Sequence, residues 1–328
     1  MNVTLNLLLV IVGFVLLIKG ADMLVNGASS LAKRFNVSDI AIGLTIVAMG
    51  TSAPELVVNI ISGTVISPNG THDVVFGNII GSNIFNIFLI LGISSVIYPL
   101  TVQRNALWKE IPYSLIATVV FFVLVNDVMF GTGDTNKLGI FDGLLLLIMF
   151  GMFLLYIFFN LQRHPDESEL LEDIVKLPVW KTLVFVALGI VGLTIGGRMI
   201  VDNAVTIAKN FNVSEKLIGL TILAAGTSLP ELATSAVAAF QKKSDLAVGN
   251  IVGSNIFNLL LVIGVTALIH NPIIYNPVLN TDLVIVMIGT FMLFIFMFTF
   301  KQYKLDRSEG LIYLMGFVAY MFYLFTRL

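Results

Sequence analysis

Two copies of a short motif place a carboxylate beside hydroxyl groups and a proline in otherwise apolar sequence. The first copy spans residues 50–55 (GTSAPE) and the second spans residues 226–231 (GTSLPE). On a helix, the threonine and serine lie four and three positions before the glutamate and therefore share its face. Oxygen ligands without nitrogen or sulfur suit hard cations, and Ca²⁺ takes about 6–8 of them. The motif pair predicts one cation site built on Glu55 and Glu231.

The proline in each motif predicts a break in the helix that carries it. Pro54 has no N–H and crowds the carbonyl four residues earlier, so the carbonyl of Gly50 loses its helical partner. Gly50 itself eases the break because glycine tolerates unusual backbone angles. Backbone oxygens freed in this way add further candidate cation ligands. A proline and an acid in membrane-buried sequence each carry a cost, so their duplication indicates function.

A second repeated run follows each motif by about twenty residues. Residues 77–86 (GNIIGSNIFN) match residues 249–258 (GNIVGSNIFN) at 9 of 10 positions. Within each run, polar residues recur every four positions and so lie along one side of a helix, and the glycines permit close helix contact. These polar residues are Asn78, Ser82 and Asn86 in the first run and Asn250, Ser254 and Asn258 in the second. We predict that the two stripes face the broken helices and complete the coordination, and we interpret Asn78 and Asn250 as helix-to-helix contacts.

The composition places this chemistry in a membrane. Hydrophobic residues make up 57% of the 328 residues and charged residues 12%, about half the ~25% charged of soluble proteins. The sequence contains no cysteine, and its three histidines fall near predicted loops, which argues against a transition-metal site. The basic residues are scattered, so no nucleic-acid footprint is present. We therefore predict an all-α integral membrane protein whose partners are lipid and cations, without a cofactor.

The apolar stretches predict ten membrane spans. Their approximate cores are 5–32, 40–67, 74–99, 108–126, 139–161, 181–208, 215–240, 246–270, 281–299 and 311–326. The chain divides into a first five-helix repeat (1–162), a polar cytoplasmic linker (163–180) and a second five-helix repeat (181–328). Supporting this division, residues 43–56 match residues 219–232 at 11 of 14 positions.

The distribution of basic residues predicts the orientation of these spans. Loops after odd-numbered spans hold 12 Lys and Arg, whereas the loops and tails on the other side hold 4. The positive-inside rule makes the first set cytoplasmic and places both termini outside. Because each half has an odd number of spans, the halves enter the membrane in opposite directions, as in many secondary transporters with a midplane site. We expect broken helices in spans 2, 3, 7 and 8.

The motif pair resembles the paired alpha-repeats of the cation/calcium antiporter superfamily, specifically its prokaryotic sodium/calcium exchanger branch. The resemblance covers nearly the whole chain and implies that Glu55 and Glu231 ligate calcium and share a sodium site. By the same resemblance, the flanking sodium sites and the centre of the site involve Thr51, Ser52, Thr227, Ser228, Ser82, Ser254, the backbone carbonyls around Ala48 and Ala224, and the amides of Asn86 and Asn258. Asparagine at both central positions argues against potassium dependence, and the Thr-Ser pairs favour sodium over protons.

The resemblance implies an electrogenic antiporter of the cell membrane that exchanges Na⁺ for Ca²⁺ and extrudes Ca²⁺, with a monomer sufficient for function. Proton/calcium exchange and sodium-coupled transport of another divalent cation are the nearest alternatives. An intramembrane enzyme is disfavoured because no histidine or lysine is placed to activate a serine. A cation channel is disfavoured because channels usually build their pores from several symmetric subunits.

Overall fold

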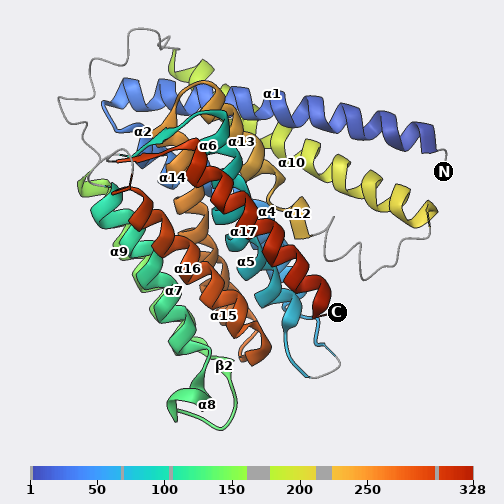
Figure 1. Ribbon diagram of the computed structural model, residues 1–328, viewed down its shortest axis with the longest axis vertical. Coiled ribbons are helices and arrows are strands. Elements are labelled where there is room, and N and C mark those ends of the chain that lie inside the picture. Colours follow the sequence, from blue (N-terminus) through green and yellow to red (C-terminus); the bar gives the residue numbers. More distant parts are fainter. Residues whose placement is uncertain are drawn as a thin grey trace.

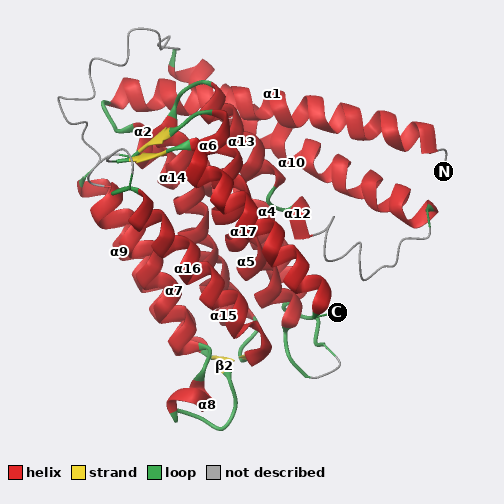
Figure 2. Ribbon diagram, in the orientation of Figure 1, coloured by secondary structure: helices red, strands yellow, loops and turns green. Residues whose placement is uncertain are grey.

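The computed structural model describes residues 3–67, 70–102, 106–160, 178–211, 224–299 and 303–327. Most of these residues lie in helices (Figure 2). Within these ranges, eight helices are long and apolar enough to cross a bilayer, and a bent pair of shorter helices in residues 39–62 brings the number to nine. The prediction of a helical, multi-pass membrane protein is therefore confirmed. The predicted span 215–240 begins outside the described residues.

The first half of the chain follows the predicted order of spans. Its helices are α1 (Val3–Phe35), α2 (Asp39–Ile42), the π-helix η1 (Gly43–Val47), α3 (Ala48–Thr51), α4 (Ala53–Ser62), α5 (Asp73–Ile84), the π-helix η2 (Phe85–Ile90), α6 (Leu91–Ile97), the π-helix η3 (Ala106–Glu110), α7 (Ile111–Leu124), the short α8 (Asp127–Phe130) and α9 (Ile140–Phe159). Consecutive short elements such as α5, η2 and α6 together form one span.

The second half repeats much of this pattern. Its helices are α10 (Val179–Asn210), α12 (Ala224–Gly226), α13 (Leu229–Phe240), α14 (Ser244–Ile256), the π-helix η6 (Phe257–Val262), α15 (Ile263–Ile269), the 3-10 helix η7 (Pro277–Leu279), α16 (Asn280–Phe296) and α17 (Arg307–Thr326). The described residues also include four strands of two residues each: β1 (Leu100–Thr101), β2 (Lys137–Leu138), β3 (Ile273–Ile274) and β4 (Lys304–Leu305).

Helices α1 and α10 form a closely packed antiparallel pair that lies across the top of the bundle in Figure 1. Glycines on α1 recur every seven residues, at positions 13, 20 and 27, and the first two lie against glycines of α10. At Gly20 the approach is so close that an added Cβ would lie 2.7 Å from the backbone nitrogen of Leu193 and 2.9 Å from the carbonyl oxygen of Gly189. The 33 residues of α1 correspond to about 50 Å of helix, which exceeds a ~30 Å bilayer core. An oblique course accommodates this length.

The helices that carry the repeated asparagines form the centre of the protein. The spans Asp73–Ile97 and Ser244–Ile269 are the most enclosed, with 72% and 83% of their apolar stretches buried. The prediction that spans 3 and 8 are broken is wrong. Each span continues through a π-helical turn, η2 or η6, because a π turn accommodates one extra residue while the backbone hydrogen bonding continues.

Short strand pairs join the two halves at their loops. Strand β1 pairs antiparallel with β4, with Leu100 opposite Leu305. Strand β2 pairs antiparallel with β3, with Leu138 opposite Ile273. Each pair takes one strand from each half of the chain. The halves are therefore held together by these loops as well as by the packing of their membrane-length helices.

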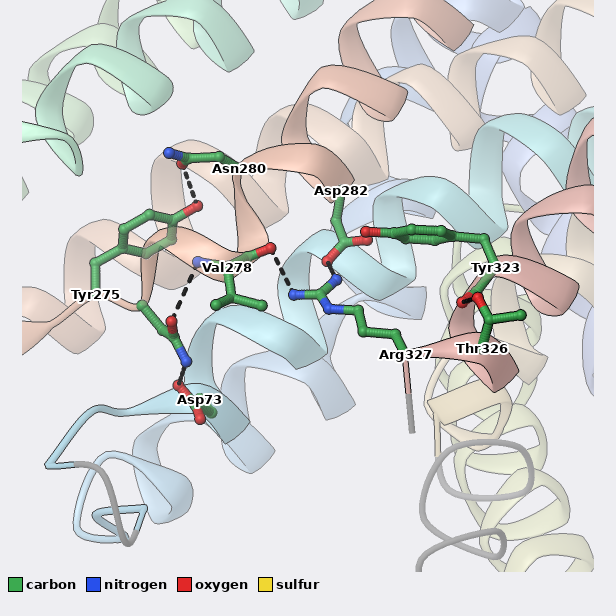
Figure 3. Close-up of polar contacts among 9 residues, drawn as sticks. Asp73, Tyr275, Val278, Asn280, Asp282, Tyr323, Thr326 and Arg327 are labelled. Atoms are coloured by element: carbon green, nitrogen blue, oxygen red, sulfur yellow. Dashed lines mark hydrogen bonds and ion pairs between the residues drawn. The ribbon is translucent and has the colours of Figure 1, made fainter. Parts of the chain in front are cut away.

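The end of the last helix is fixed by a buried ion pair (Figure 3). Arg327, just after α17, donates to the Oδ2 atom of Asp282 at 2.8 Å and to the carbonyl oxygen of Val278. Asp282 is only 3% exposed. The neighbouring loop is held by Asn276, whose amide donates to Asp73 at the start of α5. These contacts tie α17, α16 and α5 together at one end of the molecule.

Candidate cation-binding site

Each copy of the proline-glutamate motif interrupts a helix, as the sequence predicts. In the first half, α3 ends at Thr51 and α4 begins at Ala53, and the two helical segments are bent by 43°. Ser52 between them has φ −86° and ψ 5°. Glu55 lies in the first turn of α4, where unpaired amide N–H groups and the helix dipole favour a negative charge.

The second copy has the same local structure. Helix α12 ends at Gly226, and α13 begins at Leu229 after two residues outside the helices. Ser228 has φ −90° and ψ 6°, close to the values of its counterpart in the first motif. Glu231 lies in the first turn of α13. The two halves thus present their carboxylates from equivalent half-helix starts.

The two motifs contact each other through their polar side chains. The Ser52 hydroxyl donates to the Oε1 atom of Glu231 at 2.8 Å. Reciprocally, the Ser228 hydroxyl donates to the Oε1 atom of Glu55 at 3.5 Å. Both glutamates are 1% exposed. The fold therefore brings two carboxylates, which are 176 residues apart in sequence, into one buried polar cluster.

Oxygen atoms without hydrogen-bond partners gather on the predicted site residues. Within the described part of the chain, 15 buried side-chain nitrogen or oxygen atoms have no partner, and seven of them belong to predicted site residues. These seven are Glu55 Oε2, Glu231 Oε2, Ser82 Oγ, Ser254 Oγ, Thr227 Oγ1, Asn86 Oδ1 and Asn258 Oδ1. Leaving a buried polar atom unpaired costs about 1–3 kcal/mol, so seven such atoms call for a ligand. All seven are oxygens, the donor type that hard cations prefer.

The central asparagines lie at the π turns and are paired across the halves. Asn86 donates its amide hydrogen to Asn255 Oδ1 at 2.9 Å, and Asn258 donates to Asn83 Oδ1 at 3.0 Å. Sequence reasoning missed Asn83 and Asn255. Both lie in the repeated GSNIFN runs, three residues before the predicted ligand, so their duplication was the signal that could have identified them.

The two outer asparagines of the polar stripes behave differently. Asn250 accepts a hydrogen bond from the Thr51 hydroxyl at 3.1 Å and donates to Ser235 at 2.9 Å. Its counterpart Asn78 donates to Asn59 at 2.8 Å, which matches its interpretation as a helix-to-helix contact. Asn250 therefore contacts the candidate site directly, because it accepts a hydrogen bond from a hydroxyl of the first motif.

The remaining predicted ligands are backbone carbonyls. The carbonyl oxygen of Ala48 accepts from the Ser52 amide at 2.9 Å and from the Thr51 hydroxyl at 3.3 Å. Ala224 is the first residue of α12. In the described residues no group of three or more His, Cys, Asp or Glu side chains could hold a metal ion. The candidate site thus offers two carboxylates, Glu55 and Glu231, together with neutral oxygens.

Comparison with known proteins identifies the family. The family model described as "Sodium/calcium exchanger protein" matches residues 5–159 and 181–326. The chain belongs to this family. A protein of Alkalimonas amylolytica named as antiporter CaxA is 38% identical over 323 residues, which cover 97% of this chain and 98% of the relative. Sodium/calcium exchanger MaX1 of Methanosarcina acetivorans is 27% identical over 357 residues, covering 98% and 99%.

A solved structure of this family has the same fold. The sodium-calcium exchanger NCX_Mj matches with a TM-score of 0.82 and 31% sequence identity, over 98% of this chain and 100% of that chain. Members of the family bear the names of exchangers and antiporters. The names of these relatives are those of membrane transporters, in agreement with the membrane-length helices of this chain.

Proposed function

We propose that this protein is a secondary antiporter that exchanges Na⁺ for Ca²⁺ at one shared site. The observation that carries the proposal is the reciprocal contact of the two motifs, in which each carboxylate has one oxygen bound by a serine and the other without a partner among the described residues. Two carboxylates balance the charge of one Ca²⁺, and neutral oxygens from both halves surround them.

The proposal assigns roles to the predicted residues. Glu55 and Glu231 ligate Ca²⁺ and also contribute to sodium binding. Oxygens for sodium come from Thr51, Ser52, Thr227, Ser228, Ser82 and Ser254 and from the carbonyls of Ala48 and Ala224, and Asn86 and Asn258 close the centre. In this scheme a cation at the Ala48 carbonyl displaces the hydrogen bond that the Thr51 hydroxyl now donates there.

The net charge of the loaded site, together with the membrane potential, supports a direction of transport. One Ca²⁺ neutralises two carboxylates, whereas three Na⁺, as expected for the family, leave the loaded site with one positive charge. Moving that charge makes the exchange sensitive to voltage by about 2.3 kcal/mol per 100 mV. An interior-negative membrane then drives Na⁺ inward and Ca²⁺ outward, so we propose electrogenic calcium extrusion across the cell membrane.

The proposed architecture is ten spans in two inverted halves, residues 1–162 and 181–328, joined by a polar cytoplasmic linker at 163–180, with both termini extracytoplasmic. Its support is the reciprocity of contacts between the halves, both in the strand pairs and in the serine-glutamate bonds. An inverted repeat allows one site to be exposed alternately to each side of the membrane.

The test is ⁴⁵Ca²⁺ uptake into proteoliposomes loaded with Na⁺, with K⁺ or a proton gradient substituted in parallel and the voltage set by valinomycin. We expect uptake that requires internal Na⁺ and increases with a positive-inside potential. Uptake driven equally by a proton gradient would instead establish proton/calcium exchange. Glu55→Gln should abolish uptake in either case, and an unchanged rate in this variant would refute the site.

A further inference from the structure

Four asparagines of the repeated GSNIFN runs form two equivalent hydrogen bonds across the centre of the protein. Asn86 donates its Nδ2 hydrogen to Asn255 Oδ1, and Asn258 donates its Nδ2 hydrogen to Asn83 Oδ1, at 2.9 and 3.0 Å. An offset of 172 residues converts one bond into the other. All four side chains are at most 2% exposed, so bulk water has little access to them.

Each of these hydrogen bonds fixes the orientation of the side-chain amide group that donates it. A side-chain amide carries two N–H donors on one arm and a carbonyl acceptor on the other. Because Nδ2 is bound to the opposite half, the Oδ1 atom is turned the other way. The Oδ1 atoms of Asn86 and Asn258 are both buried and have no hydrogen-bond partner among the described residues. The reversed amide would present N–H groups there and would repel a cation.

We propose that Asn83 and Asn255 are positioning residues that turn the carbonyl oxygens of Asn258 and Asn86 toward the transported ion. This inference rests on the proposed function, because it deepens the account of the same site. Neither positioning residue needs to touch the ion. Each acts by supplying an acceptor that only the N–H arm of its partner can satisfy.

The backbone around Asn86 and Asn258 explains why a residue of the other half is needed to orient their side chains. Asn86 and Asn258 lie within π-helical turns, where their carbonyls bond to the amides five residues later, Leu91 and Ile263. A π turn shifts the side chains that follow it relative to a regular helix and often occurs at functional sites. The shifted asparagine side chains are then oriented by a residue of the other half rather than by their own helix.

Removing the acceptor should weaken ion binding. In Asn83→Leu, the Asn258 amide loses its partner and both of its orientations become accessible. Loss of a residue that orients a metal ligand typically costs about 10–100-fold in affinity. We expect this weakening in equilibrium binding of ⁴⁵Ca²⁺ to the purified full chain, and the same in Asn255→Leu.

Another asparagine pair provides a matched control. Asn126, just after α7, and Asn280 in α16 also bond reciprocally across the halves, at 3.0 and 2.7 Å, and Asn126 is 1% exposed. Neither belongs to the site. Asn126→Leu removes a buried amide bond of the same kind, so we expect a lower melting temperature with unchanged Ca²⁺ affinity. Equal loss of affinity in Asn126→Leu and Asn83→Leu would overturn the proposal.

Two further variants cover the case in which Asn83→Leu does not fold. Asn83→Asp retains an acceptor for Asn258 but loses the bond that the Asn83 amide donates to the Asn255 carbonyl oxygen at 3.4 Å. Ca²⁺ should therefore bind more tightly to Asn83→Asp than to Asn255→Leu, and binding equally weak in both would overturn the inference. Asn86→Asp has an oxygen on both arms and needs no orientation, so adding Asn255→Leu to it should weaken binding less than Asn255→Leu weakens it in the wild type. Failure of the wild type to bind Ca²⁺ would refute the proposed function itself, whereas wild-type binding that Asn83→Leu and Asn255→Leu leave unchanged would refute only this inference.

Discussion

Replacing Arg327 tests the buried ion pair at the end of the last helix. The Arg327 side chain is 23% exposed and that of Asp282 is 4% exposed, with 2.8 Å between the charged atoms (Figure 3). Arg327→Leu keeps an apolar stem but leaves the Asp282 carboxylate without its cation. Breaking a buried pair in this way costs about 3–5 kcal/mol. Because the arginine is partly exposed, we expect the lower end, about 3 kcal/mol, which for a chain of 328 residues corresponds to a fall of roughly 4 °C in melting temperature.

The assay is thermal unfolding of the purified protein in detergent. The double variant Arg327→Leu/Asp282→Asn removes both charges and should recover at least half of the loss, because the cost comes from the unpaired carboxylate. Arg307→Leu is the control at the other end of α17, where the arginine makes a 3.4 Å hydrogen bond to a carbonyl oxygen. A double variant less stable than Arg327→Leu, or an equal loss in Arg307→Leu, would refute the reasoning.

Three further predictions concern other parts of the fold. Burial lowers the pKa of His72, just before α5, from its usual 6.5. Below pH 6.5 the unfolded chain therefore binds more protons than the folded chain, and the melting temperature should fall as the pH drops below about 6.5. The fall should be smaller in His72→Gln. Gly20→Ala forces α1 and α10 apart and should cost about 1–3 kcal/mol in thermal unfolding, whereas Gly151→Ala, where an added Cβ meets no heavy atom of the described residues within 4 Å, should not destabilise. Asn250→Leu removes the nearer of the two acceptors of the Thr51 hydroxyl, so Na⁺ should compete about tenfold less well with ⁴⁵Ca²⁺. A similar further loss on adding Asn250→Leu to Thr51→Val would contradict this.

Local sequence patterns were enough to predict most of the membrane-length helices and the helix breaks at the two proline motifs. Apolar stretches of membrane length identify spans because a helix in lipid must satisfy its own backbone. Pro54 and Pro230 mark the starts of the half-helices, since proline lacks the N–H that would continue the preceding helix. These are properties of a few neighbouring residues, so they can be read without knowing which segments meet.

The pairings of the site depend on packing between segments that are far apart in the chain. Spacing by four indicated that Asn86 shares a helix side with Ser82, but not that Asn255 binds its amide, nor that spans 3 and 8 continue through π turns. Likewise, the repeat indicated two equivalent motifs, whereas the contact of Ser52 with Glu231 rather than with Glu55 exists only when the halves are packed face to face. A hydrogen bond acts over about 3 Å, so the partner of each buried oxygen is decided by the tertiary arrangement of the two halves.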